Sequence, residues 1–210
     1  MTHWSEGTPR QPARENFPER GAAGIRAFVA IRMSEAVEEK IGALIDRIRH
    51  PNDCIRWVRR ANLHVTLKFL GPAVDPRRLA PFADAMRALA ARTAPFEIEA
   101  RGVGAFPDLD RPRVIWVRLE SVELGALAAR VEAAAAECGF AREERHWSGH
   151  LTIGRIRDPH GFTPTRAELA EAAREEFGAS RIESITLYRS HLAPEGSTYE
   201  ALATFLFGVR

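Results

Sequence analysis

The sequence predicts a mixed fold of strands and helices, arranged as two similar β-α-β-α-β units in one chain of 210 residues. Apolar residues recur at the two-residue period of strands and at the three-to-four-residue period of helices, in the same order in each half. The second strand of each half also carries a His-x-Thr motif, at His64 and His150, 86 residues apart. The elements are offset by about 87 residues, so the motif and the duplication support each other.

The first unit begins with an apolar run at residues 25–31, which predicts a buried strand. Ser34 can cap the helix that follows it. Further strands are predicted at 63–70 and 96–103, before the turn-rich residues 104–112. The two helices between these strands are indicated by apolar stripes at Val37, Ile41, Leu44, Ile45 and Ile48, and at Leu79, Phe82, Met86 and Leu89.

The second unit repeats this order, with strands predicted at 114–119, 147–155 and 182–188. Thr165 and Glu168 form a capping box for its second helix. A final apolar run at 202–207 closes the chain. The helices of this unit are indicated by apolar residues at Leu124, Leu127, Val131 and Cys138, and at Leu169, Ala173 and Phe177.

The composition is that of a globular protein with a single folded domain, 45% hydrophobic and 28% charged. Residues 1–24 contain several prolines and glycines and little periodicity. We therefore expect a flexible N-terminal leader at 1–24, a single two-lobed domain at 25–210, and a monomer. The 30 basic and 28 acidic residues leave a formal charge of +2, which excludes a protein that holds long nucleic acid by a gross basic excess.

The two cysteines and the hydropathy indicate the compartment. Cys54 and Cys138 are isolated, which excludes a disulfide framework and a structural zinc site and favours the reducing cytoplasm. No run approaches the roughly 18 apolar residues of a membrane span. The N-terminal residues also lack the apolar segment of a signal peptide, so we expect no membrane partner.

The His-x-Thr strands carry the predicted chemistry. Side chains alternate faces along a strand, so His64, Thr66 and Lys68 share one face, opposite Val65, Leu67 and Phe69. His150 and Thr152 share a face in the same way, with Leu151 and Ile153 behind them. The apolar faces can enter the core, which leaves two imidazoles and two hydroxyls to line one cleft.

Two opposed imidazoles suit in-line attack on a phosphodiester. With an unperturbed pKa of about 6.5, one imidazole can be neutral and act as a general base while the other is protonated and acts as a general acid. Threonine hydroxyls beside them can donate hydrogen bonds to phosphoryl oxygens. The histidines move the protons and the hydroxyls hold the charge, so we expect neither a metal nor another cofactor.

Beyond these motifs, the chain resembles the two-histidine (2H) phosphoesterases, and within them the RNA 2′,3′-cyclic phosphodiesterases, also called 2′-5′ RNA ligases. The resemblance spans about residues 25–210. It is carried by Asn62-Leu63-His64-Val65-Thr66-Leu67-Lys68-Phe69-Leu70-Gly71, by Gly104-Ala105-Phe106-Pro107 with Arg111-Pro112-Arg113-Val114-Ile115-Trp116, by His150-Leu151-Thr152-Ile153-Gly154-Arg155, and by the stretch from Leu187 through Gly196 and Tyr199 to Phe207.

This resemblance implies a bilobal α+β fold with pseudo-two-fold symmetry and a central cleft. It implies hydrolysis of RNA 2′,3′-cyclic phosphate ends to 2′-phosphomonoesters, and reversible 2′-5′ ligation with an RNA 5′-hydroxyl as nucleophile. His150 would be the proton acceptor and His64 the proton donor, while Thr66 and Thr152 would hold the phosphate. The chain departs from the family at Gly149, where proline is common, and at His191, where we expect a small polar residue; His191 is either a surface histidine or a substrate contact.

For five further residues, the sequence allows either a role in substrate binding or a purely structural role. Arg155 matches the family's arginine and can pair with phosphate or form a surface ion pair, although strict alternation places it opposite His150. Lys68 adds positive potential to the cleft or lies at a solvated strand end. Three aromatic residues are either platforms for base stacking or part of the core: Phe106, Trp147 and Tyr199.

The alternatives to this interpretation are a metal site and two other functions. His146 and His150 have the spacing of metal ligands on a helix, but a strand separates such residues by more than about 13 Å. A second enzymatic interpretation keeps the chemistry and changes the substrate to a small cyclic nucleotide or a 2′-5′-linked oligonucleotide. The non-enzymatic interpretation is an RNA-end binding module, which has no need of both proton-transfer groups.

Overall fold

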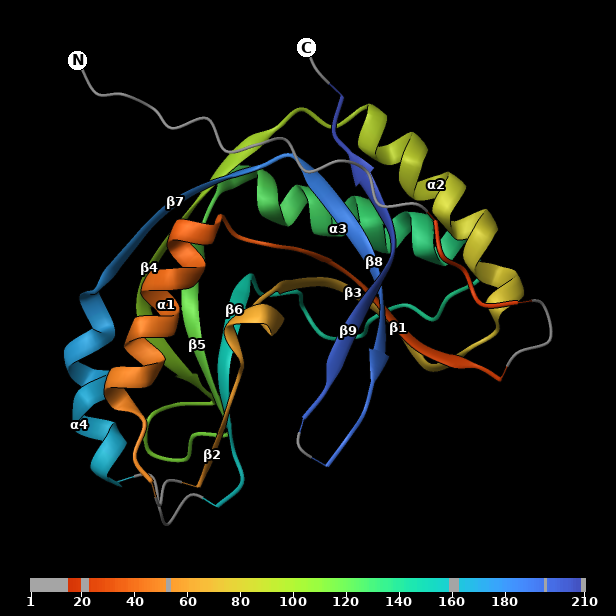
Figure 1. Cartoon of the computed structure of the whole chain (residues 1–210). Helices are drawn as coiled ribbons and strands as arrows, with labels where there is room; N and C mark the ends of the chain where they lie inside the picture. The colour runs from red at the N-terminus through yellow and green to blue at the C-terminus, as the bar shows by residue number, and fades with distance from the viewer. Residues whose placement is uncertain (1–14, 20–22, 52–53, 159–162, 195, 209–210) are drawn as a thin grey trace, which may run out of the picture.

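The computed structural model describes residues 15–19, 23–51, 54–158, 163–194 and 196–208, which form two curled antiparallel sheets with helices packed on them (Figure 1). The strands are β1 (Ile25–Ile31), β2 (Ile55–Trp57), β3 (Val65–Val74), β4 (Phe96–Phe106), β5 (Val114–Glu120), β6 (His150–Ile156), β7 (Glu176–Ile182), β8 (Ser184–His191) and β9 (Thr198–Leu206). The helices are α1 (Glu35–Ile48), α2 (Leu79–Ala91), α3 (Val122–Glu137) and α4 (Thr163–Glu171).

The predicted duplication is confirmed, and its two units are interleaved. The units are β1-α1-β3-α2-β4 and β5-α3-β6-α4-β8. The four-stranded sheet has the order β3-β1-β8-β9 and the five-stranded sheet the order β2-β6-β5-β4-β7. Each unit therefore gives its third strand, β4 or β8, to the sheet of the other. Neither unit forms a complete sheet without the other.

Three boundaries of the second half differ from the sequence prediction. Helix α4 begins at Thr163, so Thr165 lies inside the helix and the predicted capping box with Glu168 is wrong. Phe177 lies on β7 and not on that helix. The predicted strand at 147–155 begins only at His150. Strands β2 and β7 were not predicted, because short or half-exposed strands have no distinctive period.

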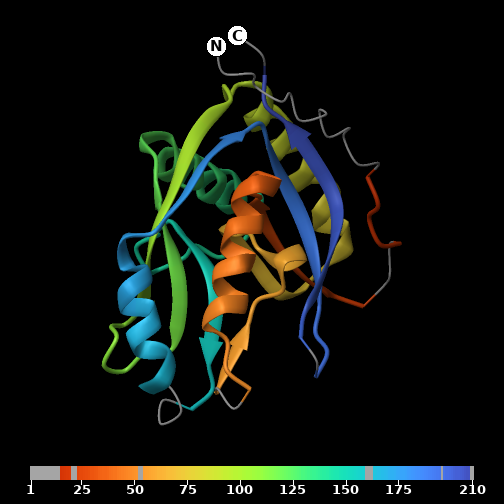
Figure 2. The same ribbon diagram turned by 60° about the vertical axis from the view of Figure 1, so that its left-hand side comes forward.

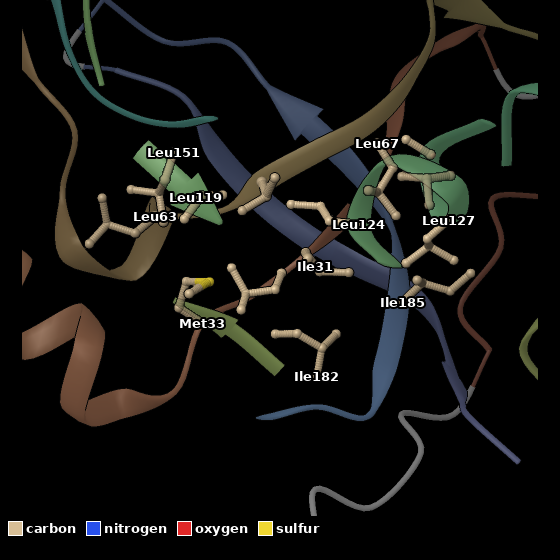
Figure 3. Packing of buried hydrophobic residues seen from close by; sticks show 14 of the residues in the cluster. Ile31, Met33, Leu63, Leu67, Leu119, Leu124, Leu127, Leu151, Ile182 and Ile185 are labelled. Atoms are coloured by element: carbon tan, nitrogen blue, oxygen red, sulfur yellow. The ribbon is translucent and has the colours of Figure 1, made fainter. Parts of the chain in front are cut away.

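The helices are divided between the outer faces of the two sheets. Helices α2 and α3 pack against β9 and β3 of the four-stranded sheet, while α1 and α4 pack against β7 and β4 of the five-stranded sheet (Figure 2). Leu67 of the first motif strand, Leu63 just before that strand and Leu151 of the second motif strand are buried in one continuous hydrophobic cluster (Figure 3). The apolar faces of both motif strands thus share one core, which fixes the opposite faces relative to each other.

The described part of the N-terminal segment touches the domain. The Asn16 backbone N–H donates to the Leu202 carbonyl at 2.8 Å, and Phe17 packs against the core. Residues 1–14 and 20–22 lie outside the described residues, so the division into a leader and a domain at 25–210 stays a prediction. Within the described part of the chain, no helix is long and apolar enough to cross a membrane.

Candidate active site

The two histidines are held by the same hydrogen bond. The Nδ1 atom of His64 lies 2.7 Å from the Asn62 carbonyl, and that of His150 lies 2.8 Å from the Ser148 carbonyl. A carbonyl oxygen can only accept, so Nδ1 carries the proton in each neutral imidazole. This leaves the lone pair of each Nε2 available as a base, and each protonated Nε2 available as an acid.

A bulge at the same position of each motif strand changes which side chains face the site. The β1–β3 pairing passes from Thr66 to Lys68 and skips Leu67, and the β5–β6 pairing passes from Thr152 to Gly154 and skips Ile153. An extra residue in one strand inverts the alternation beyond it. The motif histidines and threonines precede the bulge and keep their predicted common face.

The inversion corrects the prediction for Lys68 and Phe69. Lys68 is buried and its Nζ donates to Glu132 of α3, whereas Phe69 is 39% exposed with the Arg26 guanidinium 4.4 Å from its ring centre. Their predicted faces are therefore wrong. The same inversion turns Arg155 to the face of Thr152, because Ile153 and Gly154 are both buried and Arg155 is exposed.

Lys68 instead stabilises the segment that leads to the second motif. Its Nζ lies 2.7 Å from Glu132 Oε2 and 2.7 Å from the Ala141 carbonyl, which precedes β6. Glu132 also accepts the Glu143 backbone N–H at 3.0 Å. The ammonium is therefore occupied in holding residues 141–143 against α3.

Trp147 and Gly149 complete this connection. The Trp147 indole N–H donates to the Thr66 carbonyl at 3.1 Å, which ties the segment before β6 to the first motif strand. A Cβ at Gly149 would lie 3.0 Å from Cη2 of Trp147. The absence of a side chain at Gly149 thus makes room for the indole, which gives this departure from the family pattern a structural reason.

Aromatic rings surround both imidazoles. His64 lies 5.0 Å, between ring centres, from Phe28 and from Tyr199, and Tyr199 meets it edge to face. His150 meets Phe106 edge to face at 5.1 Å. Tyr199 and Phe106, which we expected to stack on bases or to lie in the core, therefore contact the predicted proton-transfer groups.

The pKa values of both histidines are lowered. Burial is the largest cause for His64, and the positive charges of Arg32, Arg155 and His150 lower its pKa further, against the hydrogen bond to Asn62. Burial also lowers the pKa of His150, and Arg155 adds to the effect. Both imidazoles are thus mostly neutral at pH 7 in the free protein, which differs from the predicted neutral and protonated pair. Arg155 lowers the pKa of both histidines, so its charge lies near both imidazoles.

The remaining predicted residues are placed as follows. Thr66 is exposed and Thr152 half-buried, and neither hydroxyl has a hydrogen-bond partner among the described residues. His191 lies at the end of β8, where its Nε2 contacts Glu200 at 3.0 Å. No group of three or more His, Cys, Asp or Glu residues is close enough to hold a metal within the described ranges.

Two positioning residues escaped the sequence prediction. Asn62 donates its side-chain amide to the Ser197 carbonyl at 2.6 Å, while its backbone carbonyl accepts from His64. Arg32, bound by Glu38 and by the Ala61 carbonyl, places a positive charge near His64. Asn62 stands two residues before the histidine. A backbone carbonyl accepts a hydrogen bond whatever the residue type, so the sequence does not reveal this role.

A duplicated α+β fold that brings one His-x-Thr strand from each unit to a common site defines the two-histidine class that the sequence resembles. A model of the 2′-5′ RNA ligase superfamily matches residues 37–193. The chain is 31% identical over 182 residues to the RNA 2′,3′-cyclic phosphodiesterase of Methanothermobacter thermautotrophicus, covering 86% of this chain and 98% of that protein. It is 32% identical over 183 residues to the protein of the same name from Archaeoglobus fulgidus, covering 86% and 99%.

Solved structures agree with this assignment. The crystal structure of TT0787 from Thermus thermophilus is similar with a TM-score of 0.73 and 26% identity, covering 88% of this chain and 99% of that one. Escherichia coli LigT complexed with 3′-AMP has the same fold, with a TM-score of 0.70 at 23% identity over 88% and 98% of the two chains. The chain belongs to the 2′-5′ RNA ligase superfamily.

Proposed function

We propose that the protein hydrolyses 2′,3′-cyclic phosphodiester ends of RNA to 2′-phosphomonoesters. The matched hydrogen bonds of the two histidines carry this proposal, because each fixes Nδ1–H and frees Nε2 for proton transfer. The relatives named RNA 2′,3′-cyclic phosphodiesterase support the choice of substrate. We propose RNA as the partner and a monomer as the acting form. The free cysteines Cys54 and Cys138 favour a cytoplasmic location, where thiols stay reduced.

In the proposed reaction, His150 Nε2 takes a proton from water as the water oxygen attacks phosphorus. The P–O3′ bond breaks, and His64 Nε2–H gives its proton to the leaving 3′ oxygen. Thr66 and Thr152 donate to the phosphoryl oxygens, and Arg155 stabilises their charge. These roles are proposals for each of the five residues.

The lowered pKa values require that substrate binding supply the acid. His64 is mostly neutral in the free site, because burial and nearby positive charges oppose its protonation. A bound phosphate anion offsets the charge of Arg155 and favours the imidazolium. We therefore expect substrate binding to raise the pKa of His64, so that the imidazole takes up a proton as the substrate binds.

The decisive experiment follows an RNA with a 2′,3′-cyclic end in EDTA and identifies the position of the product phosphate. His64→Ala and His150→Ala should each reduce turnover by about 10²- to 10⁴-fold with the fold intact, because each removes one proton-transfer group. His191→Ala is the matched control, since His191 pairs with Glu200 at a strand end. Undiminished hydrolysis by either motif variant would contradict the proposal.

The same assay separates the alternatives. Faster turnover of cyclic mononucleotides than of RNA ends would favour a small-molecule substrate. Tight binding of the cyclic end without product over hours would favour a binding module. Activity in EDTA tests the expectation that no metal takes part.

A further inference from the structure

Three arginines without a carboxylate partner lie beside the candidate active site: Arg155, Arg56 and Arg59, here called the arginine track. Arg56 of β2 lies directly opposite Arg155 of β6 in the register of that antiparallel pair, so their side chains share a face. Arg59 follows just before the short 3₁₀ helix that leads to His64. All three side chains are exposed, and within the described ranges none of them forms an ion pair with Asp or Glu.

This arrangement costs stability in the absence of a ligand. Like charges directly opposite each other in a sheet destabilise it. Arg60, the neighbour of Arg59, is neutralised instead, because its guanidinium lies 3.2 Å from Glu35 and 3.0 Å from Glu39. The arginine track keeps its positive charge on the surface, where a bound anion would offset the repulsion.

The turn between β8 and β9 holds the outer part of the track in place. Arg56 donates to the Pro194 carbonyl at 2.6 Å, and Arg59 donates to the Ser197 carbonyl at 3.1 Å. A carbonyl is uncharged and takes one of the five N–H donors of a guanidinium, so both arginines keep their charge and further donors. Strand β2 and this turn lie at the same end of the molecule (Figure 1, Figure 2).

The outer end of the track lies beside His64. The Ser197 carbonyl that accepts from Arg59 also accepts the side-chain amide of Asn62 at 2.6 Å. The backbone carbonyl of Asn62 in turn holds Nδ1 of His64. His64 is the proposed acid at the 3′ oxygen, and the ribose with that oxygen also carries the 5′ oxygen that joins it to the rest of the RNA. We therefore expect the RNA to leave the site on the His64 side, along Arg56 and Arg59.

We propose that Arg56 and Arg59 bind the phosphodiesters that precede the cyclic end, so that this surface is a subsite for single-stranded RNA upstream of the terminal nucleotide. The inference rests on the proposed function and deepens it, because the subsite distinguishes RNA ends from cyclic mononucleotides. Guanidinium groups bind phosphate oxygens through paired N–H donors, and backbone contacts carry no sequence information. The subsite should therefore accept any base sequence.

The length of the substrate tests the proposal. We would measure kcat/KM for uridine 2′,3′-cyclic phosphate and for oligouridylates of two, three and four nucleotides with the same cyclic end. Two arginines suit two phosphodiesters, so kcat/KM should rise with the first two added nucleotides and level off at the third. On a plot of log kcat/KM against log salt concentration, the trinucleotide should be steeper than the mononucleotide by about 1.4, at about 0.7 for each contact with a single strand.

Substitution of the two arginines should affect the longer substrates selectively. Arg56→Gln and Arg59→Gln should each lower kcat/KM for the trinucleotide by about two- to five-fold, the value of an exposed ion pair, and the double variant by about ten-fold. The loss should be in KM and not in kcat, because the contact binds ground state and transition state alike. Turnover of the cyclic mononucleotide should stay within about two-fold of the wild type, since it has no upstream phosphate.

Charge and position are controlled separately. Arg56→Lys and Arg59→Lys keep the positive charge and should keep the steep salt dependence, whereas each glutamine variant should lose about 0.7 of the slope. Arg92→Gln is the matched control, because it removes an exposed arginine at the C-terminal end of α2. It should resemble the wild type on every substrate.

Two results would overturn the inference. Equal losses on the mononucleotide and the trinucleotide would mean that the two arginines only hold the turn beside His64. A wild-type kcat/KM that does not rise with substrate length would place the arginine track outside RNA binding. A wild-type protein that hydrolyses none of these substrates is a different result, because it refutes the proposed function itself.

Discussion

Replacing Glu132 by glutamine should destabilise the protein more than replacing Lys68 by methionine. The Lys68 side chain is 4% exposed and the Glu132 side chain 24% exposed, with 2.7 Å between Nζ and Oε2. Glu132→Gln leaves a buried ammonium that cannot reach water, whereas Lys68→Met leaves a carboxylate that can. Removing one partner of a buried pair costs about 3–5 kcal/mol, and the partial exposure of Glu132 puts this case at about 3 kcal/mol.

The methionine variant should lose about 1 kcal/mol, because its stem still fills the space and mainly the Ala141 carbonyl loses a donor. Urea unfolding measures both values; with a slope of about 3 kcal/mol/M, the midpoints fall by about 1 M and about 0.3 M. Both variants should lose much less activity than the roughly 10²-fold cost of removing a proton-transfer group. A midpoint for Lys68→Met as low as that for Glu132→Gln would refute the structural role assigned to Lys68. A loss of kcat/KM above about 10²-fold in a folded Lys68→Met variant would refute it as well.

Further predictions concern the two imidazoles. The kcat/KM profile should be bell-shaped with its optimum below pH 6.5, because the pKa values of the base His150 and the acid His64 both lie below 6.5 in the free protein; a maximum above pH 7 would contradict this. Arg155→Gln should raise the pKa of both histidines in an NMR titration and raise KM, and unchanged titration curves would place Arg155 away from the site. The free energy of unfolding should fall as the pH decreases from 6.5 through the folded pKa values, because the unfolded chain binds more protons there. Urea unfolding of His64→Ala should show a shallower fall than the wild type.

The sequence predicted correctly that the histidine and the threonine of each motif share a face, because this depends only on the two-residue alternation over three residues. His64 directly precedes β3 and His150 begins β6, and Thr66 and Thr152 come before the first irregularity in these strands. The alternation fails one residue later, at the bulges. A bulge depends on how the neighbouring strand pairs, and nothing in the local period of apolar residues reports it.

The exchange of β4 and β8 between the sheets escaped prediction for a related reason. Period and propensity identify a strand, but the choice of neighbour is decided by long-range packing. The crossed strands have a consequence for the site, because they make one core support both motif strands. A substitution at Leu63 or Leu151 in that core should therefore affect the spacing of both histidines.

The two motif strands differ in what covers their outer edge, and a cavity lies beside Thr66, Lys68 and Phe69 of β3. Strand β2 pairs with β6, and Gly154 admits it closely, since a Cβ there would lie 2.9 Å from Ile55 Cγ2. Strand β3 has no such neighbour and is the edge of its sheet. The segment before β6 takes that place through the bond from Trp147 to the Thr66 carbonyl, and a single indole leaves space that a paired strand would fill. The similar hydrogen bonds of the two imidazoles thus stand in unequal surroundings, with this cavity beside His150.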